Sequence, residues 1–168
     1  ATTDMLTGIA NRRAFLETAE SAYAHSCHSG EPLTLLMLDL DHFKAINDRY
    51  GHLEGDRALV AFAQAVKSQL RASDAVGRLG GEEFGVLLPL TTLAEGLEAA
   101  HRILQSVRSL QPSDDTGQAY RITTSLGVGA FRQSDRSLRD MLDRADQALY
   151  LAKHRGRDQI ASLETPGD

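Results

Sequence analysis

Two aspartates, Asp39 and Asp41, lie at the end of the apolar run from Leu33 to Leu40. Such a run predicts a strand buried on both faces, and residues two apart project to one side of a strand. Carboxylates at a buried strand end cost desolvation energy unless a partner compensates, and Mg²⁺ takes oxygen ligands that it shares with phosphates. We therefore interpret Asp39 as a metal ligand. For Asp41 alone we favour the N-cap of a helix that begins near His42.

A second pair of carboxylates, Glu82 and Glu83, follows Gly80 and Gly81. Paired glycines adopt positive φ readily and let the backbone approach a ligand, while adjacent like charges repel unless they share a cation. Taken alone, ordinary turn chemistry is the better interpretation. Taken with Asp39, a cross-strand carboxylate cluster is favoured, and carboxylates with Mg²⁺ are typical of phosphoryl and nucleotidyl transfer.

The residues between these pairs suit a nucleotide. Lys44 offers positive charge to phosphates, and the side chains of Asn47 and Asp56 carry acceptors that suit the Watson–Crick edge of a purine. Lys153 and Arg157, four residues apart, could bind terminal phosphates. Without other context we interpret these two as cations placed favourably at a helix C-terminus.

The elements that must position these residues follow from hydrophobic periodicity. Paired glycines between two short apolar segments predict a β-hairpin with Glu82 and Glu83 at its tip. The expected order is helix, strand, two helices, hairpin, helix, strand, helix and a final strand. Four of the helices are expected over 11–25, 53–70, 93–107 and 138–152, and a further short one begins near His42. Four of the strands are expected over 33–40, 75–79, 84–88 and 122–130. This order predicts an α+β fold, with one mainly antiparallel sheet flanked by helices.

Composition narrows the class of protein. A length of 168 residues fits a single domain, 1–168, and the formal net charge of −5 argues against broad nucleic-acid binding. Cys27 is the single cysteine, so no intramolecular disulfide can form. Since no apolar run approaches transmembrane length, we expect a cytoplasmic domain without a membrane contact of its own. The abrupt start at Ala1 suggests a piece cut from a longer protein.

The chain resembles the GGDEF family of diguanylate cyclases across nearly its whole length. Five segments in the family's order carry the resemblance, which makes it far more specific than one short motif. They are DMLTGIANRR (4–13), DLDHFKAIND (39–48), YGHLEGD (50–56), RLGGEEF (78–84) and ADQALYLAK (145–153). Glu82 stands where many members have aspartate, and both acids occur in active members.

The resemblance implies a fold shared with nucleotidyl cyclases and polymerase palms, and a reaction that condenses two GTP molecules into cyclic di-GMP. Mg²⁺, or alternatively Mn²⁺, would be held by Asp39, the backbone carbonyl of Leu40 and Glu82. Glu82 would also act as general base for the ribose 3′-hydroxyl, and Glu83 and Lys44 would belong to the same catalytic group.

The resemblance also implies the substrate contacts. Asn47 and Asp56 would read guanine, with His52 at the substrate site. Lys44 and the pair Lys153 and Arg157 would bind the polyphosphate. Because each domain holds one GTP, activity would require a two-fold homodimer. The family takes its input from an N-terminal sensory or regulatory region outside this chain, and the full-length protein could include a membrane anchor.

Arg71 and Asp74 form an R-x-x-D pattern that ends six residues before Gly80. In the family this spacing marks an inhibitory site for the product, and arginine suits guanine and phosphate as a planar donor. The alternative is a solvated, salt-bridged turn. Arg102, on the following helix, is a candidate second contact from the neighbouring domain.

Two other functions stay open at this point. A degenerate domain could bind GTP or cyclic di-GMP as a receptor without turnover, although the intact signature argues against it. A pure dimerisation module would not need Asp39, Glu82 and Lys44 together.

Overall fold

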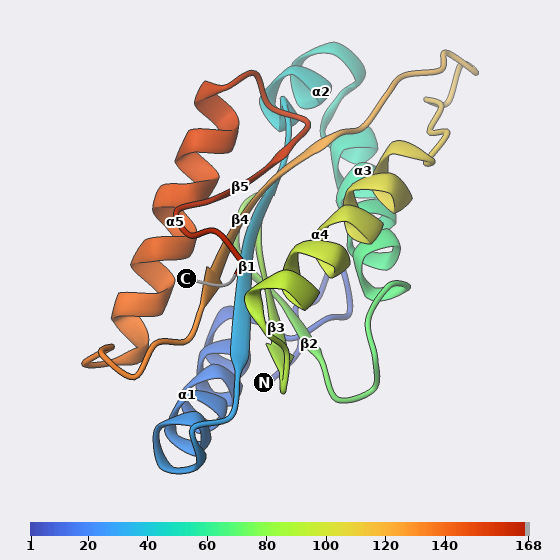
Figure 1. Ribbon diagram of the computed structural model, residues 1–168. Helices are drawn as coiled ribbons and strands as arrows, with labels where there is room; N and C mark the ends of the chain where they lie inside the picture. Colours follow the sequence, from blue (N-terminus) through green and yellow to red (C-terminus); the bar gives the residue numbers. More distant parts are fainter. Residues whose placement is uncertain (167–168) are drawn as a thin grey trace.

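The computed structural model describes residues 1–166, arranged as one sheet between helices (Figure 1). Along the chain the elements are α1 (Arg12–Ser29), β1 (Leu33–Leu40), α2 (Phe43–Tyr50), α3 (His52–Lys67), β2 (Ala75–Gly80), β3 (Glu83–Pro89), α4 (Leu93–Arg108), β4 (Thr124–Ala130), α5 (Leu138–His154) and β5 (Ile160–Ser162). The expected element order and the α+β class are confirmed.

The sheet has the strand order β2-β3-β1-β4-β5. The central strand β1 pairs antiparallel with both β3 and β4, and β2 pairs antiparallel with β3. The short strand β5 pairs parallel with β4, so the sheet is mixed rather than wholly antiparallel. All eight residues of β1 are buried, as its continuous apolar run predicts.

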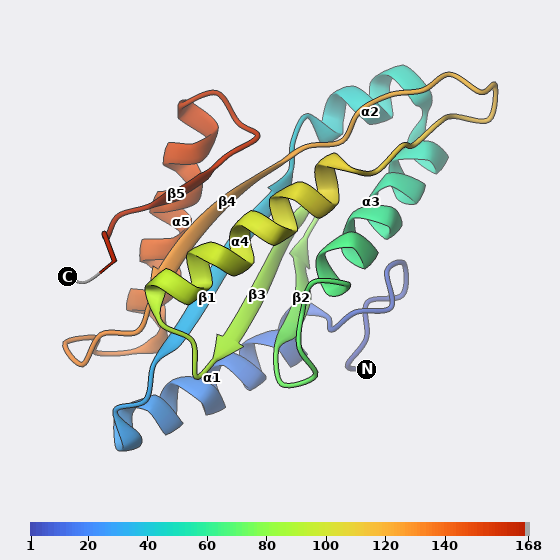
Figure 2. The ribbon, with the colours of Figure 1, turned by 45° about the vertical axis from the view of Figure 1, so that its right-hand side comes forward.

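Helices cover both faces of the sheet (Figure 2). Leu33, Leu35 and Met37 of β1 pack in one cluster with side chains of α1 and α5. Leu36 and Leu38 pack in the other cluster, with side chains of α3 and α4. Because side chains alternate along a strand, Asp39 belongs to the face that α1 and α5 cover.

Several element ends match their local sequence signals. The side chain of Asn11 caps α1, and Gly30, at φ 75°, ends it. At the end of α5 the N–H of Gly156 donates to the carbonyl of Lys153, and the N–H of Arg157 donates to that of Ala152. This is the Schellman arrangement expected of a terminating glycine.

Other element boundaries differ from expectation by a few residues. The first helix runs on to Ser29, and the helix expected over 53–70 ends at Lys67. The strand expected over 122–130 begins at Thr124. Ends of this kind fray and depend on capping contacts, which periodicity alone does not encode.

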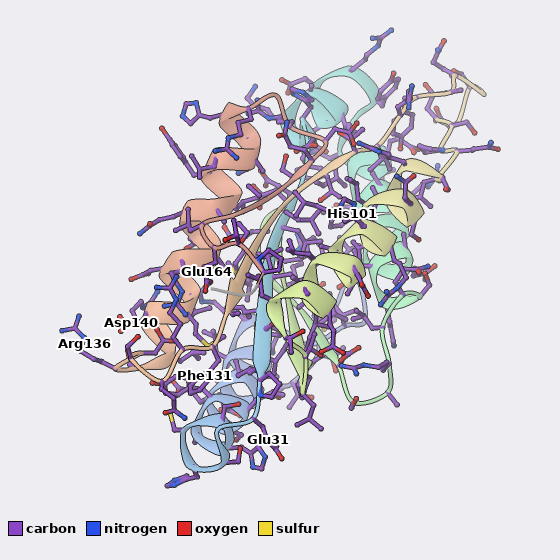
Figure 3. The ribbon with its side chains drawn as sticks, in the orientation of Figure 1. Glu31, His101, Phe131, Arg136, Asp140 and Glu164 are labelled. Atoms are coloured by element: carbon purple, nitrogen blue, oxygen red, sulfur yellow. The ribbon has the colours of Figure 1, made fainter. Side chains whose placement is uncertain are left out.

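Glu164, in the C-terminal segment, lies beside the end of β4 and helix α5 (Figure 3). The Glu164 carboxylate accepts hydrogen bonds from the Ala130 N–H at 3.3 Å and from the Arg132 side chain at 3.0 Å. Arg136 and Asp140 form an exposed ion pair at 3.7 Å near the start of α5. Among residues 1–166, no helix combines the length and apolar character that a membrane span requires.

Candidate active site at the hairpin tip

The antiparallel register of β1 and β3 brings the two carboxylate pairs to one end of the sheet. Asp39 lies opposite Glu83, and the Leu40 N–H donates to the Glu82 carbonyl at 3.2 Å. Gly80 pairs with Glu83 across a tight turn in which Gly81 has φ 47°, a conformation that favours glycine. The hairpin is therefore built so that Asp39, Leu40 and Glu82 lie together.

Asp39 is a buried carboxylate with one oxygen unsatisfied. Its Oδ2 forms an ion pair with the Lys153 ammonium of α5, and its Oδ1 has no hydrogen-bond partner. Burial raises the pKa of Asp39, and the negative charges of Glu82 and Asp41 raise it further, against the lowering effect of Lys153. A buried acceptor without a partner is costly and marks a position that a ligand can complete.

These residues fit a hard divalent cation. Asp39, Glu82 and the backbone at Leu40 offer oxygen atoms only, which is the donor set of Mg²⁺. The described residues contain no group of three or more His, Cys, Asp or Glu side chains placed to hold a metal. Mg²⁺ commonly takes one or two carboxylates from a protein and its remaining ligands from phosphates and water.

Asp41 does not cap a helix, which corrects the expectation drawn from its position. Helix α2 has His42 as its N-cap residue, with no side-chain capping bond. The Asp41 carboxylate is buried and accepts hydrogen bonds from the Ser125 hydroxyl at 2.7 Å, the Thr123 hydroxyl at 2.8 Å and the Asp158 N–H at 3.0 Å. Ser125 of β4, Thr123 just before that strand and the loop after α5 thus supply the donors, so the carboxylate is not available to the start of α2.

Glu83 is half-buried beside the same cluster. Burial raises its pKa first, and the charges of Asp39 and Asp146 add to this, whereas Lys153 and Arg12 lower it. Lys153 therefore serves several carboxylates at once. A ligand phosphate would have to compete for that ammonium.

The predicted phosphate ligands lie in different settings. The Lys44 side chain is 89% exposed and pairs with Asp48 at 2.7 Å, so it is not drawn to the carboxylates. Arg157 is exposed in the loop after α5, with φ 64°. The next residue, Asp158, has φ 51° and is held by the Arg108 guanidinium at 2.8 Å. Lys153 is therefore the one of these cations that contacts Asp39.

The predicted base-reading residues lie on α2 and α3. The Asn47 Oδ1 is buried without a partner, and a Cβ at Gly55 would lie 1.7 Å from it. His52 and Asp56 are exposed in the first turns of α3. Asp56 lines a hollow of about 430 Å³ together with Leu6 and Leu53. The Asp56 carboxylate thus lies beside a hollow with both apolar and polar walls, the latter including Arg57 and Gln64.

The R-x-x-D residues lie at the other end of β2. Arg71 makes an ion pair with Asp74 at 2.8 Å and also donates to the Pro89 carbonyl and the Thr91 hydroxyl. Arg71, Asp74 and Arg102 line a single hollow of about 170 Å³. The three residues assigned to the product site are therefore adjacent, in a hollow separate from the hairpin tip.

Sequence reasoning missed Arg78, which supports the hairpin. Its Nε donates to the Gly81 carbonyl at 2.8 Å, and its guanidinium pairs with Asp4 at 3.4 Å. Asp4 also accepts the Thr7 N–H and hydroxyl. Both residues lie in segments that carry the family resemblance, which could have drawn attention to them. No local pattern, however, links two residues so far apart in the sequence.

Comparison with known proteins gives a consistent result. The model of the family "Diguanylate cyclase, GGDEF domain" matches residues 1–159. Diguanylate cyclase DgcP of Pseudomonas aeruginosa is 42% identical over 160 residues, which is 95% of this chain and 24% of that protein. The chain thus spans about a quarter of that relative's length.

Two solved structures are close in fold. The GGDEF domain of DgcB from Caulobacter crescentus, in complex with cyclic di-GMP, has a TM-score of 0.94 and 32% identity, covering 98% of this chain and 94% of that chain. The active GGEEF domain of a diguanylate cyclase from Vibrio cholerae has a TM-score of 0.85 and 32% identity, covering 92% and 97%. Both confirm the expected cyclase fold.

Proposed function

Because the chain belongs to the GGDEF family of diguanylate cyclase domains, we propose that it condenses two GTP molecules into cyclic di-GMP and releases two pyrophosphates. The observation that supports this most directly is the buried Asp39 carboxylate, which has one unsatisfied oxygen, beside Glu82 and Lys153. A fold alone does not imply activity, whereas an acidic group with an adjacent cation at a hairpin tip has the components that nucleotidyl transfer needs.

Asp39, the Leu40 carbonyl and Glu82 would hold Mg²⁺ or Mn²⁺, which supplies positive charge and polarises a phosphoryl oxygen when bound. Lys153 would turn from Asp39 to the phosphates, and Arg157 and Lys44 would bind the terminal phosphates from the rim. These cations stabilise the charge that develops on the leaving pyrophosphate.

Glu82 would accept the proton of a ribose 3′-hydroxyl, with Glu83 beside it. The 3′-oxygen then forms a bond to the α-phosphorus of the second GTP, and the bond between that phosphorus and the β-phosphate bridging oxygen breaks. Pyrophosphate leaves with the electron pair. In the second step, the 3′-oxygen of the second GTP attacks the α-phosphorus of the first, a second pyrophosphate leaves, and the ring closes.

Each domain would bind one GTP, so two domains must face each other. A two-fold arrangement places each 3′-oxygen in line with the other α-phosphorus, and activity therefore requires a homodimer, at least transiently. Asn47 and Asp56 would read the guanine edge, with His52 at the rim of that site. The regulatory region that brings two domains together would lie in the rest of a longer protein, which could also carry a membrane anchor.

Arg71, Asp74 and Arg102 would bind the product. The DgcB GGDEF domain was solved with cyclic di-GMP, which supports product binding in a relative. Here a planar arginine donor beside a buried aspartate, in a hollow apart from the hairpin, suits a guanine base. A product molecule at that site would act by favouring one arrangement of two domains over another.

Incubation with GTP and Mg²⁺, followed by anion-exchange chromatography, tests the activity. We expect cyclic di-GMP from the wild type and a loss of at least ~100-fold in Glu82→Ala and Asp39→Ala. Both variants should keep the circular dichroism spectrum of the wild type. Glu20→Ala, an exposed carboxylate on α1, is the matched control and should retain full activity.

The other outcomes identify the alternative functions. Tight binding of GTP or cyclic di-GMP by the wild type without turnover would make the chain a receptor. Failure to bind any guanine nucleotide would leave a dimerisation module.

A further inference from the structure

Of the two helices that carry the proposed base-reading residues, α2 is the shorter and the less buried. Helix α2 has eight residues, of which Ile46 alone is buried. It meets α3 at Gly51, whose φ of 92° and ψ of 162° turn the chain sharply. Asn47 lies on one side of this corner and Asp56 on the other. Their relative placement therefore depends on what holds α2 against α3.

Tyr120 contacts both helices from outside. It belongs to the connection between α4 and β4, which passes beside the α2–α3 corner in both ribbon views (Figures 1 and 2). Its ring stacks on Tyr50, the last residue of α2, with centroids 4.6 Å apart and planes at 24°. Its hydroxyl donates to Glu54 Oε2, in the first turn of α3, at 2.5 Å. One side chain thus bridges the two helices.

Glu54 depends on this contact. Its side chain is only 6% exposed, and its other oxygen has a longer contact, 3.4 Å, to Arg57. Burial raises the pKa of Tyr120, and the hydrogen bond to Glu54 raises it further, so the phenol stays a donor at neutral pH. A buried carboxylate that lost this donor would have to move toward solvent.

Movement of Glu54 would reach the base-reading residues directly. Gly55 is the next residue, and its Cα lies so close to Asn47 that a Cβ there would meet the Asn47 side chain. Asp56 follows at once. Glu54 is therefore linked to Asp56 through the backbone and to Asn47 through the close contact at Gly55. In such tight packing, a shift of Glu54 should move both predicted guanine ligands.

The rest of the connection is held independently of the Tyr120 side chain. The Asp114 carboxylate accepts hydrogen bonds from Thr116 and Gln118, and the Tyr120 backbone N–H donates to the Pro112 carbonyl. Removal of the Tyr120 hydroxyl should leave these bonds in place. Its effect is then confined to the α2–α3 corner.

We propose that Tyr120 and Glu54 are positioning residues for base selection, which fix α2 against α3 so that Asn47 and Asp56 address one guanine together. This inference rests on the proposed function, because it takes guanine as the base. It assigns a role to the α4–β4 connection, which lies outside the five segments that carry the family resemblance. Neither residue belongs to the groups proposed to hold the metal, accept the proton or bind the phosphates.

The test measures binding of 3′-deoxy-GTP and 3′-deoxy-ATP by calorimetry. Both lack the attacking hydroxyl, so affinity is read without turnover. In Tyr120→Phe, which keeps the ring and removes only the hydroxyl, we expect the Kd for 3′-deoxy-GTP to rise about tenfold, as the loss of a buried hydrogen bond implies. The preference for guanine over adenine should fall by a similar factor, and kcat with saturating GTP should change by less than about threefold.

Two further variants separate positioning from stability. Tyr23→Phe is the matched control, because Tyr23 is a buried tyrosine at α1 whose hydroxyl donates to the Asp135 carbonyl at 3.1 Å. It should leave the base preference unchanged whatever its melting temperature. Glu54→Gln retains an acceptor for Tyr120 and should stay within about threefold of wild type, whereas Glu54→Leu should match Tyr120→Phe.

An unchanged base preference in Tyr120→Phe, or the same change in Tyr23→Phe, would overturn the proposal. Turnover of GTP by the wild type is scored separately and reports only on the proposed function. A wild type that binds 3′-deoxy-GTP without making product would still give a decisive result on Tyr120.

Discussion

Asp39 and Asp41 are chemically identical side chains two positions apart, and their surroundings give them opposite tasks. Asp41 is fully satisfied, with three donors on its two oxygens. Asp39 has Lys153 on one oxygen and no partner on the other. A carboxylate kept buried and incompletely paired is a cost to the fold, and binding of a ligand there would explain it.

Asp39→Asn should stabilise the ligand-free domain at pH 7 while it abolishes synthesis. The pKa of Asp39 is raised because burial outweighs the attraction of Lys153. A raised folded pKa favours folding below the unfolded value of about 3.9, and this advantage is lost as the pH rises through the folded pKa. The ionised carboxylate thus costs stability at pH 7, and we expect a gain on the order of 1 kcal/mol.

Thermal unfolding with a chelator present, at pH 7 and at pH 4, would measure this effect. The gain should shrink at the lower pH. Asp48→Asn, an exposed partner of Lys44, is the control and should shift stability by less than about 0.5 kcal/mol. A less stable Asp39→Asn at pH 7 would mean that the Lys153 ion pair outweighs desolvation.

Helices α2 and α3 share an apolar cluster that includes Ile46 and Leu59, and they approach each other closely at Gly55. At Gly55 a Cβ would lie 1.7 Å from the Asn47 Oδ1 and 2.9 Å from its Cγ. The clash involves the end of a side chain and not the backbone, so the helices can stay together if Asn47 turns away. The absence of a side chain at Gly55 therefore mainly leaves room for the Asn47 side chain, and the helix junction depends on it less.

Gly55→Ala should keep the fold and lose GTP affinity. In a helix interior, alanine is more favourable than glycine by about 1 kcal/mol, which offsets part of the cost of the local crowding. We expect a melting temperature within a few degrees of wild type and a Kd for 3′-deoxy-GTP at least ~10-fold higher, as expected when a buried polar ligand contact is lost. Calorimetry and thermal unfolding would measure the two quantities.

The double variant Asn47→Ala with Gly55→Ala provides the control. It should relieve the crowding and restore stability without restoring affinity. If Gly55→Ala bound 3′-deoxy-GTP as tightly as wild type, Asn47 would not be a guanine ligand.

The two ligand sites inferred for this chain lie at opposite ends of β2. The hairpin tip follows Gly80, whereas Arg71 and Asp74 precede Ala75, and Arg102 faces the same hollow from α4. A ligand in that hollow cannot touch the carboxylates of the same domain. We expect its effect on synthesis to act through the relative position of two domains.

Arg71→Ala should relieve inhibition by cyclic di-GMP and spare the uninhibited rate. In the wild type, excess GTP should not relieve the inhibition, because the product would bind away from the substrate site. Arg102→Ala should weaken product binding without loosening the turn that Arg71 ties to Pro89 and Thr91. Initial rates over a grid of GTP and cyclic di-GMP concentrations would measure both effects.

Lys67→Ala, an exposed cation at the end of α3, is the control for loss of charge and should change nothing. Inhibition that persists in Arg71→Ala, or that GTP overcomes, would place the product in the catalytic site.

The local sequence by itself determined most of the fold. An uninterrupted apolar run indicated β1, paired glycines indicated the hairpin tip, and the helical stripes indicated α3, α4 and α5. These signals act between near neighbours, where periodicity and backbone freedom decide the structure. The same signals singled out Asp39 as a buried carboxylate that needs a partner.

The tertiary structure alone decided how the polar side chains are paired. Asp39 forms an ion pair with Lys153 of α5, and Tyr120 donates a hydrogen bond to Glu54. Asp41 accepts hydrogen bonds from hydroxyls at β4 and does not cap a helix. Each choice depends on which strand or loop lies alongside, and those partners are remote in sequence. Because a hydrogen bond acts only at contact distance, no local pattern could have foretold them.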